Sequence, residues 1–122
     1  MTKIELDHFS VSNGSIFSLN NGGIAIPAGT YIIAASLYVK VNTLTNGSIA
    51  KGVYIRNNAG TELVGVQDWS YYIAIEGGTA IAPKIVTFTN SDILYLYGRS
   101  LNVAGTAYPS SGATYLTIIR LN

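Results

Sequence analysis

Residues 67–72, with the sequence Gln-Asp-Trp-Ser-Tyr-Tyr, combine aromatic rings with carboxylate, amide and hydroxyl groups. An aromatic ring can pack against the apolar C–H face of a pyranose, while carboxylate and amide groups bind sugar hydroxyls in defined directions. We therefore expect Asp68, Trp69 and Tyr71 to form a shallow saccharide-binding site. The alternative is that Trp69 and one of the tyrosines anchor the core or a subunit interface.

Two other segments are rival binding surfaces. One is the Arg-Asn-Asn sequence at residues 56–58, and the other is the loop at residues 102–111 together with Arg99 and Tyr108. Both combine hydrogen-bonding groups with a cation, so the sequence leaves the location of a ligand site open.

The residues that hydrolytic catalysis requires are missing. His8 is the only histidine and thus the only candidate base. Asp7 is adjacent to it, so in a strand the two side chains would point to opposite faces. No spacing pairs two carboxylates across a bond, as glycosidases need. We therefore expect no catalytic residues and no enzymatic activity. The carboxylates are Glu5, Asp7, Glu62, Asp68, Glu76 and Asp92.

Cofactors and nucleic acid are not expected either. The chain has no cysteine, no cluster of histidines, no alternating-Asp calcium loop and no glycine motif that cradles phosphate. Its formal charge is +1, and no stretch gathers Lys or Arg, as a nucleic-acid surface would.

The hydrophobic pattern predicts an all-β fold. Apolar residues recur with a period of two, or in short runs rich in Val, Ile and Tyr, and no segment has a helical stripe. About ten short strands in 122 residues predict a single domain over residues 1–122, built as a two-sheet antiparallel jelly-roll sandwich. An immunoglobulin-like sandwich is the competitor, but the Cys…Trp…Cys spacing is absent. The expected strands are residues 4–11, 15–19, 23–26, 30–41, 48–56, 62–67, 71–76, 84–89, 93–97 and 113–121.

Asn and Gly residues mark the expected reversals between these strands, because both tolerate positive φ. The expected turns lie at residues 13–14, 21–23, 46–47, 58–60 and 77–78. The three prolines are expected at strand edges or in loops, where a missing backbone donor does little harm.

Several strands are apolar on both faces, most clearly residues 31–41, 92–97 and 113–121. Charged residues are also few, at 11% of the chain against about 25% in a typical domain. An antiparallel sandwich normally has a polar outer face, so a second apolar face predicts contact with another subunit. The alternative is a central strand that a loop of the same chain covers.

The sequence predicts neither a membrane span nor a cleaved signal. Its longest apolar candidate, residues 31–41, is interrupted by Ser36 and Lys40 and is shorter than a membrane helix. Charged residues occupy the start of the chain, where a signal peptide has its apolar region.

Residues 26–34, Ile-Pro-Ala-Gly-Thr-Tyr-Ile-Ile-Ala, resemble the Pro-x-x-Gly-x-Tyr entry to the third strand of the tumour-necrosis-factor-like and complement-head superfamily. Residues 85–96 are similar to its late strand pair joined by a turn with Asp, and residues 113–119 to its closing strand. The chain departs from many members at Asn90-Ser91, where a Gly usually precedes the Asp. The resemblance implies a jelly roll that assembles as a homotrimer.

In such trimers aromatic side chains often line the threefold axis, and the matching candidates are Tyr95, Tyr97 and Tyr115. Small, cysteine-free members rich in Asn, Gly and Ser look most like the heads of phage receptor-binding proteins and of collagen-like spore-surface proteins. The resemblance therefore implies a receptor-binding head that recognises cell-surface saccharide, on a phage tail tip or on a bacterial or spore surface. The alternative is a structural coat or trimerisation domain without a small ligand.

Overall fold

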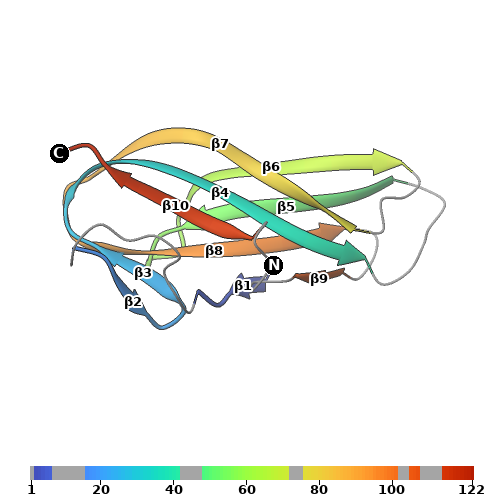
Figure 1. Ribbon diagram of the computed structural model, residues 1–122, viewed down its shortest axis with the longest axis horizontal. Coiled ribbons are helices and arrows are strands. Elements are labelled where there is room, and N and C mark those ends of the chain that lie inside the picture. Colours follow the sequence, from blue (N-terminus) through green and yellow to red (C-terminus); the bar gives the residue numbers. More distant parts are fainter. Residues whose placement is uncertain (1, 7–15, 42–47, 72–75, 102–104, 108–113) are drawn as a thin grey trace.

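A computed structural model describes residues 2–6, 16–41, 48–71, 76–101, 105–107 and 114–122 of the chain. These residues form an all-β structure of two antiparallel sheets packed face to face (Figure 1). The strands are β1 (Thr2–Ile4), β2 (Ser18–Asn20), β3 (Gly23–Ile26), β4 (Gly29–Val41), β5 (Ser48–Arg56), β6 (Glu62–Tyr71), β7 (Glu76–Phe88), β8 (Asp92–Leu101), β9 (Gly105–Ala107) and β10 (Tyr115–Arg120).

The six-stranded sheet has the order β2-β3-β8-β5-β6, and β1 also pairs with β8. The four-stranded sheet has the order β10-β4-β7, with β9 paired to the end of β4. The chain passes from one sheet to the other five times, between β3 and β4, β4 and β5, β6 and β7, β7 and β8, and β8 and β9. The two-sheet sandwich is thereby confirmed, while the jelly-roll connectivity stays a prediction.

The core lies between the sheets because both contribute one apolar face of alternating residues. On β4 the buried residues are Tyr31, Ile33, Ala35 and Leu37, each separated from the next by a half-buried residue. From the facing sheet come Ile24, Ile26, Val53, Ile55, Leu94 and Leu96. The Tyr31 hydroxyl donates to the Pro27 carbonyl at 2.6 Å, so the one polar atom of this buried ring is satisfied.

Two of the expected turns are confirmed. Asn21 (φ 50°) and Gly22 (φ 79°) form a two-residue hairpin between β2 and β3, with the paired positive φ values of a type I′ turn. Between β5 and β6 the chain reverses at Asn57, whose carbonyl accepts from Gly60 N and whose side chain accepts from Thr61 N. The expected turns at residues 13–14 and 46–47 lie outside the described residues.

Two predictions about the later strands are wrong. Gly77-Gly78 is not a turn but part of β7, because both glycines pair with β4 opposite Val39 and Tyr38. The strand expected to end at Gln67 continues to Tyr71, because β5 is long enough to pair with it throughout. In each case a partner strand outweighs weak local propensity.

Pro83 lies in β7, an edge strand, at a shift in register between β4 and β7 where Ile33 pairs with Lys84 and Ala35 with Ile81. Residues in such a bulge donate no ladder hydrogen bond, so a proline fits there. The expectation of an edge position is thus confirmed. Strand β9, which pairs with the end of β4, was not expected from the sequence.

Candidate functional site

Three tyrosines occupy the outward side of the six-stranded sheet, and we call this surface the tyrosine face. On β8, Leu94 and Leu96 are buried in the core, so the alternating residues Tyr95 and Tyr97 point outward. Tyr54 on β5 pairs directly with Tyr97. Tyr54 is only 8% exposed although it faces outward, so its ring lies flat against the sheet.

Glycines beneath the rings make this flat packing possible. A Cβ atom on Gly23 would lie 2.7 Å from the Tyr95 ring, and one on Gly52 would lie 2.6 Å from the Tyr54 hydroxyl oxygen. Carbon atoms in proteins do not approach this closely without strain, so these positions accommodate only glycine while the rings stay in place. The glycines of the outward face therefore determine the height of the tyrosine rings above the sheet.

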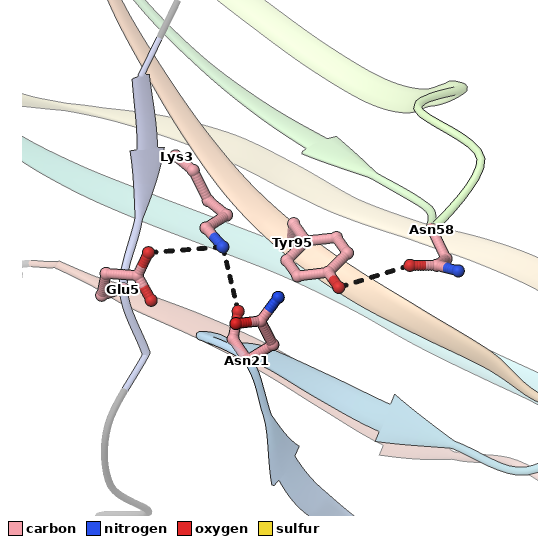
Figure 2. Close-up of polar contacts among 5 residues, drawn as sticks. All are labelled: Lys3, Glu5, Asn21, Asn58 and Tyr95. Atoms are coloured by element: carbon pink, nitrogen blue, oxygen red, sulfur yellow. Dashed lines mark hydrogen bonds and ion pairs between the residues drawn. The ribbon is translucent and has the colours of Figure 1, made fainter.

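Cationic side chains cover two of the three rings. Lys3 Nζ lies 5.2 Å from the centroid of the Tyr95 ring, and the guanidinium carbon of Arg56 lies 5.0 Å from that of Tyr97. Figure 2 shows that Lys3 is also held by Glu5, at 3.3 Å, and by the Asn21 carbonyl, at 2.9 Å. The buried Arg56 Nε has no hydrogen-bond partner within the described part of the chain.

A hollow of about 460 Å³ lies where the turn between β5 and β6 meets β2, β3 and the start of β8, and we call it the Asn58 hollow. Its lining combines apolar side chains from one end of the sandwich with hydroxyl, amide and carboxylate groups. The lining residues are Ile16, Ser18, Asn20, Ala25, Ile26, Pro27, Asn58, Ser91, Asp92 and Ile93. The hollow is wide open to solvent, so a ligand in it would be bound from one side.

The outward side of the four-stranded sheet has a different character, and we call it the isoleucine face. Ile119, Ile32 and Ile85 stand side by side across β10, β4 and β7. Ile85 is 63% exposed and Ile119 is 51% exposed, and Tyr115 on the same side is 48% exposed. Four of the six exposed large hydrophobic residues found among the described side chains belong to this sheet or follow it directly: Ile85, Tyr115, Ile119 and Leu121.

The residues expected to bind saccharide all lie on β6. Trp69 pairs with Ala50 and Tyr71 with Ser48, so their positions share one face of the sheet, while the position of Asp68, opposite Lys51, belongs to the other face. The side chains of these three residues lie outside the described part of the structure. Their role stays a prediction.

The tyrosines expected at a threefold axis are not brought together on one surface. Tyr95 and Tyr97 lie on the tyrosine face, whereas Tyr115 lies on the isoleucine face at the other side of the sandwich. One contact surface of a subunit can therefore contain Tyr95 and Tyr97, or it can contain Tyr115, but not all three.

Of the residues considered for catalysis, His8 and Asp7 lie outside the described residues. Among the side chains that the structure does describe, no group of three or more His, Cys, Asp or Glu could hold a metal ion. Within the same part of the chain, no helix is long and apolar enough to cross a membrane.

No protein-family model matches the chain. Among curated proteins none shows significant similarity to it.

Sequence reasoning missed the contributions of Lys3 and Asp92. Lys3 is distant in sequence from Tyr95, and only the pairing of β1 with β8 brings the two together. Asp92 follows the Asn-Ser turn at the start of β8, and its Oδ1 accepts from the backbone N of Ile93 and of Asn58. An Asp at a turn before an apolar run was a visible signal for the first contact, but nothing in the sequence indicated the second.

Proposed function

We propose that this chain is a head domain that assembles as a homotrimer and binds saccharide on a cell surface, at a phage tail tip or on a bacterial or spore surface. The observation that carries the proposal is the contrast between the two outer faces. One presents bare aliphatic side chains, and the other presents aromatic rings with hydrogen-bonding groups. Self-association needs the first surface and sugar recognition needs the second.

The isoleucine face is suited to contact with copies of itself. None of the residues paired in register on this face from Thr30 to Tyr38 is charged, so two copies would meet without like-charge repulsion. At roughly 25 cal/mol per Å², each 400 Å² of apolar area buried contributes on the order of 10 kcal/mol before association costs. Threefold symmetry is the arrangement that the resemblance to tumour-necrosis-factor-like heads favours, and Tyr115 is then the tyrosine near the axis.

The tyrosine face is free for a ligand in such an assembly. The cations over the Tyr95 and Tyr97 rings, with nearby amides, supply donors to sugar hydroxyls, and an aromatic ring at position 69 would supply a surface for the C–H face of a sugar. Trp69 and Tyr71 on β6 remain the first candidate site, because their positions belong to this face of the sheet, whereas the position of Asp68 belongs to the other face.

The proposal is tested by light scattering and by glycan-array binding of the purified chain. A mass three times that of the 12.9 kDa chain and selective binding to surface glycans are expected. Trp69→Ala should abolish the array signal, and Trp69→Phe, which keeps an aromatic face, should retain part of it. A monomer would overturn the assembly, and a trimer that binds no saccharide would favour the structural coat domain.

A further inference from the structure

The Asn58 hollow contains two polar side chains that the fold holds in defined orientations. Asp92 Oδ1 accepts from Ile93 N at 2.7 Å and from Asn58 N at 3.1 Å. Two backbone donors on one oxygen restrict the rotation of the carboxylate. The second oxygen, Oδ2, has no hydrogen-bond partner among the residues that the structure describes, so it is available as an acceptor.

The side chain of Asn58 is oriented from the other side. The Tyr95 hydroxyl donates to Asn58 Oδ1 at 3.3 Å, and Figure 2 shows the amide nitrogen of Asn58 directed away from Tyr95. An amide whose oxygen is engaged in this way offers its NH₂ group as a donor. Within the described part of the chain that NH₂ group has no partner. The ring of Tyr95 packs over Gly23 of β3, so the sheet fixes the position of the hydroxyl that orients Asn58.

An acceptor and a donor on neighbouring groups are what a pair of sugar hydroxyls requires, because each hydroxyl both donates and accepts. Ser18 and Asn20 supply further polar groups from β2, and Ile93 and Pro27 supply apolar surface in the same lining. The lining contains one carboxylate and no Lys or Arg, which disfavours phosphate and acidic sugars.

We propose that the Asn58 hollow binds a neutral hexose unit, with Asp92 Oδ2 accepting from one hydroxyl and the Asn58 side-chain NH₂ donating to its neighbour. The inference takes saccharide as the ligand class from the proposed function, but it assigns the sugar to residues that differ from those of the β6 site. The two sites are separable by experiment, because β2, β3 and the start of β8, which line the hollow, lie at the opposite end of the sandwich from the end of β6 (Figure 1).

The experiment is a titration of the ¹⁵N-labelled full chain with glucose, galactose, mannose and N-acetylglucosamine, followed by amide chemical shifts. At least one neutral sugar should shift the Asn58 side-chain NH₂ and the backbone amides of Ser91 and Ile93. Glucuronic acid should shift them less. Shifts confined to residues 66–71 would support the proposed function and overturn the hollow, and no shift with any sugar would overturn both.

Two variants test the assigned hydrogen bonds in the same assay. Asp92→Asn keeps an oxygen for the two backbone donors but removes the charged acceptor, and it should weaken sugar binding about tenfold. Asn58→Asp keeps the acceptor for Tyr95 but removes the donor, and it should weaken binding at least as much. Amide spectra as dispersed as that of the wild type show that both variants fold.

Tyr95 is a positioning residue in this scheme. Tyr95→Phe removes the hydroxyl that orients Asn58, so sugar binding should weaken severalfold and the Asn58 side-chain resonances should move even without sugar. The matched control is Asn90→Ala, which changes an exposed Asn in the turn between β7 and β8 that does not line the hollow. Equal affinity in Asp92→Asn, Asn58→Asp and Asn90→Ala would overturn the assignment.

Discussion

The tyrosine face and the isoleucine face are both the outward sides of their sheets, but they differ in how much apolar surface they expose to solvent. On the tyrosine face, the aromatic rings pack flat over glycines, and Arg56 lies over the ring of Tyr97. Tyr54 is therefore almost fully buried although it faces outward. On the isoleucine face, β-branched side chains stand upright with nothing of the described chain over them, and Ile85 is 63% exposed. Within the described part of the chain, side chains of the same chain therefore cover most of the apolar surface on one outer face, while the other face exposes its apolar side chains.

The largest effect is expected from a charge on the isoleucine face. Ile85→Asp places a carboxylate where each subunit would bury it, and since an unpaired buried charge costs several kcal/mol, association should weaken roughly a thousandfold or more. Light scattering across a dilution series measures the loss. Asn90→Asp adds the same charge at an exposed turn and should leave the mass unchanged. An unchanged oligomer in Ile85→Asp would show that this face is not the contact.

A smaller effect is expected from filling a glycine position under the tyrosine face. In Gly23→Val the new Cβ would meet the Tyr95 ring and the Leu94 carbonyl, and such overpacking typically costs about 1–3 kcal/mol. Ala25→Val on the same side of β3 is the matched control, because that position already carries a Cβ. Urea unfolding compares the two variants. Equal stability of Gly23→Val and Ala25→Val would contradict the inference that the Tyr95 ring needs a glycine at position 23.

A still smaller change is expected at the cation over Tyr97. Arg56→Met removes a cation–π contact of about 0.5–2 kcal/mol. It also removes the buried Nε that has no described partner, and such a donor costs about 1–3 kcal/mol. The two effects oppose each other, so the free energy of unfolding should change by less than about 1 kcal/mol. A loss of several kcal/mol would show that Arg56 has a stronger role in this face than its contacts indicate.

The smallest effect is expected at the ion pair beside Tyr95. Glu5 is 65% exposed in its side chain, and an exposed pair of this kind contributes about 0–1 kcal/mol. Glu5→Gln should therefore change the urea midpoint very little, and less at high salt than at low salt. A large loss of stability that does not depend on salt would show that Glu5 is needed to hold Lys3 over the Tyr95 ring.

The parts of the fold that local chemistry specifies were predictable. Strands at residues 23–26 and 48–56 lie where the alternation placed them, and the Asn21-Gly22 hairpin follows from the tolerance of both residues for positive φ. The parts that depend on a partner strand were not. Gly77-Gly78 has the local signal of a turn, but β4 pairs with both glycines and keeps them extended.

The candidate site divides in the same way. The sequence showed Arg56, Asn57 and Asn58 as one rival surface, because their side chains carry the chemistry of sugar binding. It did not show that Asp92 and Tyr95 hold Asn58 from two sides, since those contacts join β8 to the turn between β5 and β6. Nor could residue type distinguish Tyr95 and Tyr97 from Tyr115, which differ in the sheet that carries them.

The sequence by itself determined that this protein is an all-β sandwich whose strands include several with apolar residues on both faces. Period-two alternation and turn residues act within a few positions of the chain, so they can be recognised without a structure. Only the tertiary structure decided which outer face has tyrosine rings packed over glycines and which face exposes isoleucine side chains in the described part of the chain. That choice depends on the register between strands far apart in sequence, and register brings Lys3 to Tyr95 and Ile119 to Ile32 and Ile85.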